Sequence, residues 1–212
     1  MILALLLQAA APDYVSPVAA EIGFMRDAQD KGQWQAFGHW AAEEGILVGR
    51  RMLPAKELAA ALAADEPEQP LYWLATRSIL SCHGRTAINS GPYLDPAGGT
   101  GRFHTVWQWQ EGTGWRYLLD LGIEDAAARL PAAAPVVELE RPSCRNLPDP
   151  DPPVDYETDK AQGRIAMSGD ASLKWEWRLG QWGDRAEQRR LLRVWGWDGG
   201  DYRLLIEAEQ EN

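Results

Sequence analysis

Residues 71–122 read LYWLATRSILSCHGRTAINSGPYLDPAGGTGRFHTVWQWQEGTGWRYLLDLG and predict four antiparallel strands, at 71–82, 86–94, 102–110 and 115–122. Turn residues separate the strands. His83 and Gly84 suit a two-residue hairpin loop in which glycine supplies the positive φ, residues 95–100 form a longer Pro/Gly loop, and residues 111–114 form a four-residue turn. Because short loops join antiparallel neighbours, this stretch predicts one continuous meander.

The loop lengths also predict a register, with Cys82 opposite Arg85, Leu94 opposite Gly101 and Gln110 opposite Trp115. Side-chain alternation then puts two rows on one face of the sheet. The apolar row contains Ile79, Ile88, Trp107 and Leu118, and the polar row contains Arg77, Ser90, Thr105 and Asp120. A polar row beside an apolar one suits the floor of a ligand pocket, although Arg77 and Asp120 could equally be ordinary charges of a sheet face. A slip of one residue in the 95–100 loop would move half of the row to the other face.

The composition limits the class of protein. The 212 residues suffice for one core with an appendage or for two small domains, and a hydrophobic content of 45% indicates a globular chain. The net charge of -10 and the pI of about 4.8 argue against a nucleic-acid partner or an anionic membrane surface, since both require a basic protein surface. The 11 tryptophans indicate aromatic clusters in the core, in a pocket or at an interface.

The chain begins with MILALLLQAAA, a short apolar run followed by small residues. This pattern resembles an export signal, although no Lys or Arg precedes the apolar run. The run is too short to cross a bilayer, so we expect no integral membrane segment in the mature chain. Residues 1–16 are therefore predicted to be an export signal and leader of a periplasmic protein. A frayed N-terminal segment is the alternative.

The chain has two cysteines, Cys82 and Cys144. An even number suits a single disulfide in an oxidising compartment, and two free thiols are the alternative. Neither residue has enough Cys or His neighbours to complete a zinc set, so we expect no metal. We expect no cofactor either, because the GGTG segment at 98–101 lies between two strands and opens no helix.

Helix signals precede the sheet. Ser16 and Pro17 suit the start of a helix that ends at Gly32. A second helix is predicted at 33–42, with Trp34 and Phe37 on one side and His39 pointing away from them. A short strand at 46–48 and an alanine-rich helix at 54–64 follow. Helices followed by a curved antiparallel sheet indicate an α+β fold with the helices on one face.

This order of elements resembles the nuclear transport factor 2-like cone fold, the superfamily of SnoaL-like cyclases and ketosteroid-isomerase-like proteins. The stretches that carry the resemblance are GQWQAF at 32–37, GRFHTVWQWQ at 101–110 and WRYLLDLG at 115–122. The resemblance covers residues 17–124, about half of the chain. It implies a pocket between the helices and the concave face of the sheet, with Trp34 and Phe37 over the row that contains Trp107.

The composition changes after the sheet. Residues 125–160 are rich in proline and aspartate and predict an extended linker. Three strands are expected in the C-terminal segment 161–212, at 173–179, 190–197 and 202–208, because apolar and polar residues alternate there. A lone three-stranded meander is marginal in water, so we expect it to dock on the first domain, either extending the sheet edge or covering its outer face.

The sequence contains no complete set of catalytic residues. His83 lies in a turn, and the predicted register puts His104 on the face opposite Thr105 and Asp120. Asp120 is the one candidate base, because a carboxylate on an apolar face has a raised pKa. We therefore expect a protein that holds a small, mostly apolar ligand without catalysis. The alternatives are an isomerase, dehydratase or cyclase that uses Asp120 as base and Arg77 for an anionic group, and a dimeric association module.

Overall fold

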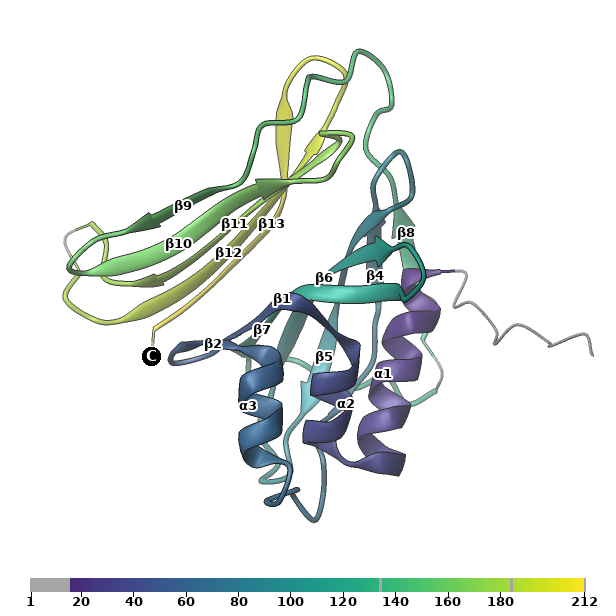
Figure 1. Cartoon of the computed structure of the whole chain (residues 1–212), viewed down its shortest axis with the longest axis vertical. Coiled ribbons are helices and arrows are strands. Elements are labelled where there is room, and N and C mark those ends of the chain that lie inside the picture. Colours follow the sequence, from purple (N-terminus) through teal and green to yellow (C-terminus); the bar gives the residue numbers. More distant parts are fainter. Residues whose placement is uncertain (1–15, 134, 184, 212) are drawn as a thin grey trace, which may run out of the picture.

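The computed structural model describes residues 16–133, 135–183 and 185–211 and shows an α+β protein with helices, a large mixed sheet and a second, antiparallel sheet (Figure 1). The predicted export signal falls almost entirely on residues 1–15, outside the described residues. None of the helices in the described ranges is both long enough and apolar enough to cross a membrane.

The helices begin where the sequence signals predict. In α1 (Pro17–Lys31) the Ser16 hydroxyl accepts a hydrogen bond from the Ala19 N–H at 3.1 Å, and Gly32 ends the helix with φ of 119°. This backbone angle favours glycine. The second helix, α2 (Gln33–Trp40), ends two residues before the predicted end, because the chain enters β1 at Ala41. The third, α3 (Ala55–Leu62), follows Pro54.

The large sheet has the strand order β2-β1-β7-β6-β5-β4-β8, and β3 pairs with β5 beside β4. Its strands are β1 (Ala41–Val48), β2 (Met52–Pro54), β3 (Tyr72–Trp73), β4 (Arg77–Leu80), β5 (Thr86–Leu94), β6 (Thr100–Gln110), β7 (Gly114–Glu124) and β8 (Glu138–Glu140). The meander of β4 to β7 confirms the predicted strands, except that the first is divided into β3 and β4. The division lies where the Leu74 backbone crosses Gly91, so closely that a Cβ on Gly91 would lie 1.9 Å from the Leu74 carbonyl oxygen.

The predicted register is right at one junction and wrong at the next two. Between β4 and β5, Arg77 pairs with Ser90 as expected. Between β5 and β6, however, Leu94 pairs with Thr100 and not with Gly101. The reason is a tighter turn, in which the Asp95 N–H donates to the Gly99 carbonyl oxygen at 2.8 Å.

At the next junction a β-bulge between Val106 and Trp107 changes the pairing part-way along the strands. Thr105 opposes Asp120 as predicted, but Trp107 opposes Tyr117 in place of Leu118. The two errors divide both predicted rows between the two faces of the sheet. On the outer face the apolar row is Ile79, Ile88, Val106 and Leu119.

The C-terminal sheet contains β9 (Val154–Glu157), β10 (Ala161–Met167), β11 (Leu173–Gly180), β12 (Arg189–Trp197) and β13 (Tyr202–Glu211), in the order β13-β12-β11-β10-β9. It therefore has five strands where the sequence predicted three, and the predicted linker at 125–160 contributes β8 and β9. Trp175, Trp177 and Leu192 of this sheet share one buried cluster with Ile88 and Val106 of the large sheet.

The C-terminal sheet thus covers the outer face of the large sheet, on the side away from the helices, which confirms one of the two expected dockings (Figure 1). A homodimer that paired through this outer face would need the face to be free, and the chain's own strands occupy it. The homodimer stays a prediction that requires another surface.

A disulfide joins Cys82, in the turn between β4 and β5, to Cys144, with 5.6 Å between the two Cα atoms. This is the first of the two alternatives that the sequence left open. Two side chains of the loop between β10 and β11 bond to the same turn: the Cys82 N–H donates to the Ser172 hydroxyl at 3.0 Å, and the His83 N–H donates to the Asp170 carboxylate at 2.5 Å. The turn therefore fastens the two sheets together.

We expect Leu192→Ala to lower the free energy of unfolding by about 2–5 kcal/mol, because it opens a cavity at a fully buried position between the sheets. Leu204→Ala is the matched control in the same sheet, since Leu204 is 46% exposed, and its effect should stay within about 0.5 kcal/mol. Urea unfolding followed by tryptophan fluorescence measures both. Equal effects of the two substitutions would contradict the described packing.

The paired substitutions Cys82→Ser and Cys144→Ser should lower the free energy of unfolding by about 4 kcal/mol, because the bridge closes a loop with a sequence separation of 62 residues. Adding a reductant should destabilise the natural chain by a similar amount and leave the double variant unchanged. If reductant has no effect on the natural chain, the bridge does not form in solution.

Candidate functional site

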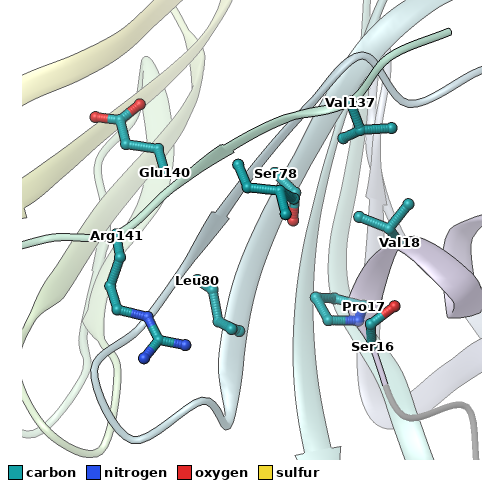
Figure 2. Close-up of a pocket in the computed structure, with 9 residues that line it drawn as sticks. Ser16, Pro17, Val18, Ser78, Leu80, Val137, Glu140 and Arg141 are labelled. Carbon is teal, nitrogen blue, oxygen red and sulfur yellow. The ribbon is translucent and has the colours of Figure 1, made fainter.

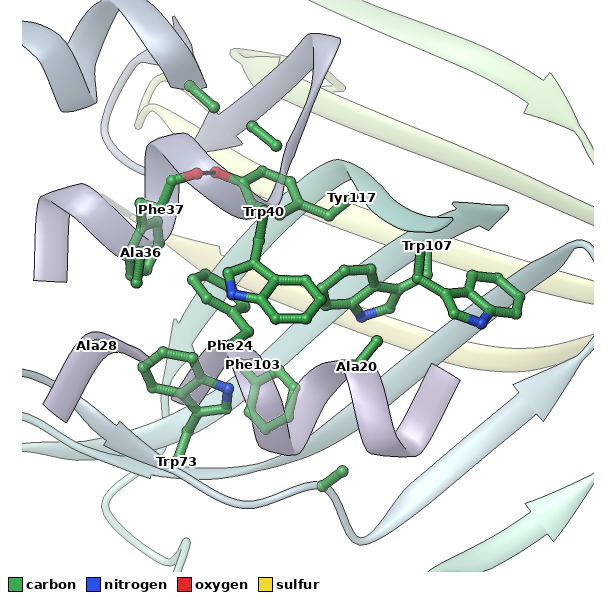
Figure 3. Packing of buried hydrophobic residues seen from close by; sticks show 14 of the residues in the cluster. Ala20, Phe24, Ala28, Ala36, Phe37, Trp40, Trp73, Phe103, Trp107 and Tyr117 are labelled. Carbon is green, nitrogen blue, oxygen red and sulfur yellow. Dashed lines mark hydrogen bonds between the residues drawn. The ribbon is translucent and has the colours of Figure 1, made fainter. Parts of the chain in front are cut away.

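The space between the helices and the inner face of the large sheet is filled by aromatic side chains (Figure 3). The Phe24 ring lies at the centre, with its centroid 4.8 Å from the rings of Phe37 and Trp73 and 6.1 Å from that of Trp107. All four side chains are buried. The predicted ligand residues Phe37 and Trp107 therefore belong to the core, and Trp34 packs at its margin, with its ring 5.9 Å from that of Phe37.

Within this aromatic core lies one carboxyl group, that of Glu21 on α1, which is 1% exposed. The indole N–H groups of Trp73 and Trp107 donate to its two oxygens, at 2.8 and 2.7 Å, and the Asn89 amide donates at 3.1 Å. Burial raises the pKa of Glu21 to about 7, against the three donors, which favour the charged form. The hydrogen bonds from the indoles fix α1 against the sheet.

A polar row does cross the inner face, with two of the four predicted members, Thr105 and Asp120. It consists of Ser78, Asn89, Thr105 and Asp120, which are register partners on β4 to β7. The Thr105 hydroxyl donates to the Asp120 carboxylate at 2.7 Å, and burial raises the pKa of Asp120 to about 6. The charge of Asp120 also contributes to the raised pKa of Glu21, so the two carboxyl groups influence each other.

The other predicted site residues lie on the opposite side of the sheet. Ile79, Ile88 and Leu118 pack in or against the cluster beneath the C-terminal sheet. Arg77 donates to the Leu205 carbonyl oxygen of that sheet at 3.1 Å, and the Ser90 hydroxyl bonds to His104 at 2.8 Å. The ten residues predicted to bind one ligand are thus divided by the sheet. Trp34, Phe37, Trp107, Thr105 and Asp120 lie on the inner side, and Arg77, Ile79, Ile88, Ser90 and Leu118 lie on the outer side.

A cleft of about 450 Å³ opens at the edge of the large sheet, between the start of α1 and the strands β4 and β8 (Figure 2). We call it the α1–β8 cleft. Its walls are mostly apolar, and Val18 of α1 lies across the cleft from Val137, which precedes β8. The described residues that line it are Ser16, Pro17, Val18, Ser78, Leu80, Val137, Leu139, Glu140 and Arg141.

The polar groups of the α1–β8 cleft are few. Ser78, the end of the inner polar row, contributes a hydroxyl to the lining, and Ser16 contributes another beside Pro17. Glu140 points away from the cleft and pairs with Arg77 at 2.5 Å (Figure 2). Arg141 therefore supplies the one cationic side chain among the described lining residues.

This cleft was not predicted from the sequence, because the proline-rich residues 125–160 predicted an extended linker. A signal was present, since Val137 and Leu139 alternate with Glu138 and Glu140 in the period of a strand. The surrounding prolines obscured it. Leu139 stays 75% exposed although it lies in a strand, so one side of the cleft presents apolar surface to solvent.

Comparison with models of known protein families gave no match, and a search of curated proteins found none that matches this chain. Among the described residues, no group of three or more His, Cys, Asp or Glu side chains is placed to hold a metal ion.

We expect the ionisation of Glu21 to lower the stability of the folded protein as the pH rises from about 4.5 to 7. The folded-state pKa of Glu21 is raised from 4.5 to about 7, so the folded protein holds this proton more tightly than the unfolded chain does. The favourable contribution of Glu21 to the free energy of unfolding is complete below pH 4.5 and is lost as the pH rises through about 7. The loss amounts to about 3 kcal/mol. Denaturant unfolding across this pH range measures it.

In Glu21→Gln this contribution should disappear, while those of Asp120, which has a raised pKa, and of His104, which has a lowered pKa and acts in the opposite direction, remain. Glu111→Gln is the matched control, since the Glu111 side chain is 78% exposed, and it should follow the natural chain. Parallel pH profiles for the natural chain and Glu21→Gln would show that Glu21 does not titrate in this range.

Proposed function

We propose that this protein binds a small, mostly apolar molecule in the α1–β8 cleft and does not catalyse a reaction on it. The observation that supports the proposal is the cleft itself. Its volume of about 450 Å³ falls within the range of small-molecule sites, and its walls include Pro17, Val18 and Leu80. Apolar walls supply affinity, and the Ser78 hydroxyl and the Arg141 guanidinium could orient one polar end of the ligand.

The chemistry of the lining favours binding over catalysis. The described lining contains no imidazole or thiol, and its one carboxylate, Glu140, is paired with Arg77. A nucleophile would need an adjacent base to activate it, and the two serines of the cleft have no such partner among the lining residues. An oriented apolar ligand is therefore the simplest occupant.

We further propose that the protein is exported, which the disulfide supports, because such bonds persist in oxidising compartments. The resemblance to the nuclear transport factor 2-like cone fold is likewise a proposal. It is supported by the chain order of two helices, a β-hairpin, a third helix and a long meander, and by β1 lying parallel to β7. If the resemblance holds, aromatic side chains occupy the interior of the cone in this protein, and the ligand binds at the edge of the sheet.

To test the site, Val18→Trp should weaken binding of the uncharged fluorescent probe N-phenyl-1-naphthylamine by at least tenfold, which corresponds to about 1.4 kcal/mol. The indole would occupy the cleft that the probe needs. Ile22→Trp, one turn further along α1 at a position 45% exposed and outside the lining, is the matched control and should bind the probe as the natural chain does.

The measurement is a fluorescence titration at fixed protein concentration. Absence of saturable binding to the natural chain, or equal affinities of the two variants, would refute the proposed site. Native mass spectrometry of protein from its own envelope fraction would then identify the natural occupant, since a bound molecule adds its mass to that of the denatured chain.

A second candidate function is proton transfer by Asp120, in an isomerase, dehydratase or cyclase. In its favour, the Asp120 carboxylate lies on the inner face of the sheet, where it accepts a hydrogen bond from Thr105 at 2.7 Å and where burial raises its pKa to about 6, a value that suits a general base near neutral pH. Tyr117, the nearest aromatic hydroxyl of the same strand, donates instead to the Phe37 carbonyl oxygen at 2.7 Å. Conversion of a β,γ-unsaturated ketone to its conjugated isomer, followed by absorbance, tests this candidate. The candidate function requires that the natural chain catalyses this conversion and that Asp120→Asn abolishes the activity.

A further inference from the structure

A second pocket, of about 500 Å³, lies between the outer face of the large sheet and β13 of the C-terminal sheet. We call it the inter-sheet pocket. Its floor contains Arg77 of β4, Ser90 of β5, and Arg102 and His104 of β6, and Ile206 of β13 lines its other side. Two of the residues predicted to bind a ligand, Arg77 and Ser90, therefore meet here, away from the cleft proposed above.

Ser90 and His104 form a buried pair at the floor. They are register partners on neighbouring strands, and the Ser90 hydroxyl lies 2.8 Å from Nδ1 of His104, with both residues more than nine-tenths buried. When the hydroxyl donates to Nδ1, the neutral imidazole carries its proton on Nε2. Within the described part of the chain no hydrogen bond to Nε2 is formed, so this N–H is available to a ligand.

The surroundings of His104 keep the imidazole neutral. Burial and the positive charges of Arg102 and Arg77 together lower the pKa of His104 to about 4. Such an imidazole is a weak base at neutral pH, so Ser90 and His104 do not form an activated nucleophile. The pair instead presents a hydrogen-bond donor between two guanidinium groups.

The two arginines have donors left over. Arg77 bonds to the Leu205 carbonyl oxygen and to Glu140, but its Nε is buried without a partner among the described residues. Arg102 uses Nε to bond Asp125 at 2.9 Å, and its side chain is 53% exposed, so its terminal nitrogens reach solvent at the mouth. The terminal nitrogens of Arg102 are therefore the guanidinium donors that an anion can reach, and Arg77 adds positive charge at the floor.

The charge around the pocket limits the ligand to a single negative charge. Glu138 of β8 and Glu207 of β13 also line it, and Glu207 is bonded to Arg193 at 2.6 Å. These carboxylates would repel a doubly charged phosphate. The side chains of Leu205 and Ile206 supply an apolar wall.

From these contacts we infer that the inter-sheet pocket binds a small organic carboxylate, held by Arg102 and by Nε2–H of His104 beside the positive charge of Arg77, with its apolar part against Leu205 and Ile206. This site is separate from the α1–β8 cleft and does not depend on it, since the two linings share no residue.

Benzoate is a suitable probe. We expect saturable binding near pH 7, measured by calorimetry, and a rise of about one unit in the pKa of His104 measured by NMR, because a nearby anion stabilises the imidazolium. Arg102→Gln should weaken binding at least tenfold. Arg85→Gln, which changes an exposed arginine paired with Glu111 outside the pocket, is the matched control and should bind benzoate normally.

Asp125→Asn provides a second variant, since it removes the partner of Arg102 and leaves the guanidinium in place. It should bind benzoate at least as tightly as the natural chain. Failure of the natural chain to bind, equal binding by Arg102→Gln and Arg85→Gln, or an unmoved pKa of His104 would each overturn the inference. Inorganic phosphate that binds more tightly than benzoate would overturn the assignment to carboxylates.

Discussion

Both faces of the large sheet are buried, one under the helices and the other under the C-terminal sheet. This constraint leaves ligands only the edges of the sheet and the gap between the two sheets. The aromatic rings around Phe24 pack together on the inner side, whereas β8 and the start of α1 meet less closely and leave the α1–β8 cleft. The two proposed binding sites are therefore both consequences of how the sheet is covered.

Burial of polar groups on the same sheet has a cost, and each face offsets it differently. On the inner face the Glu21 carboxyl receives hydrogen bonds from two indoles and an amide, so both of its oxygens have a donor. On the outer face His104 is neutral, satisfied at Nδ1 by Ser90, and flanked by arginines. The hydrogen bonds to Glu21 hold α1 against the sheet. The donors around His104, in contrast, lack an acceptor.

Much of the local structure could be predicted, because it depends on near neighbours in the chain. The cap formed by Ser16, the end of α1 at Gly32 and the strands β5 to β7 follow from capping, turn residues and alternation. The predicted site failed for an equally specific reason. The turn after Asp95 is one residue tighter than expected, and the bulge beside Trp107 shifts the pairing of β6 with β7. Because side chains alternate between faces, each of these changes moves the residues that follow it to the opposite face.

The sequence by itself determined the fold class, the helix starts, the order of the meander and the presence of a second β segment, since each depends on local periodicity and turn chemistry. Tertiary structure decided which face each side chain occupies, that residues 138–140 pair with β4, that Cys82 meets Cys144, and that Arg77, Ser90 and His104 line one pocket. These contacts join residues distant in the chain. They are fixed by how whole layers bury their apolar faces against each other, which no local pattern encodes.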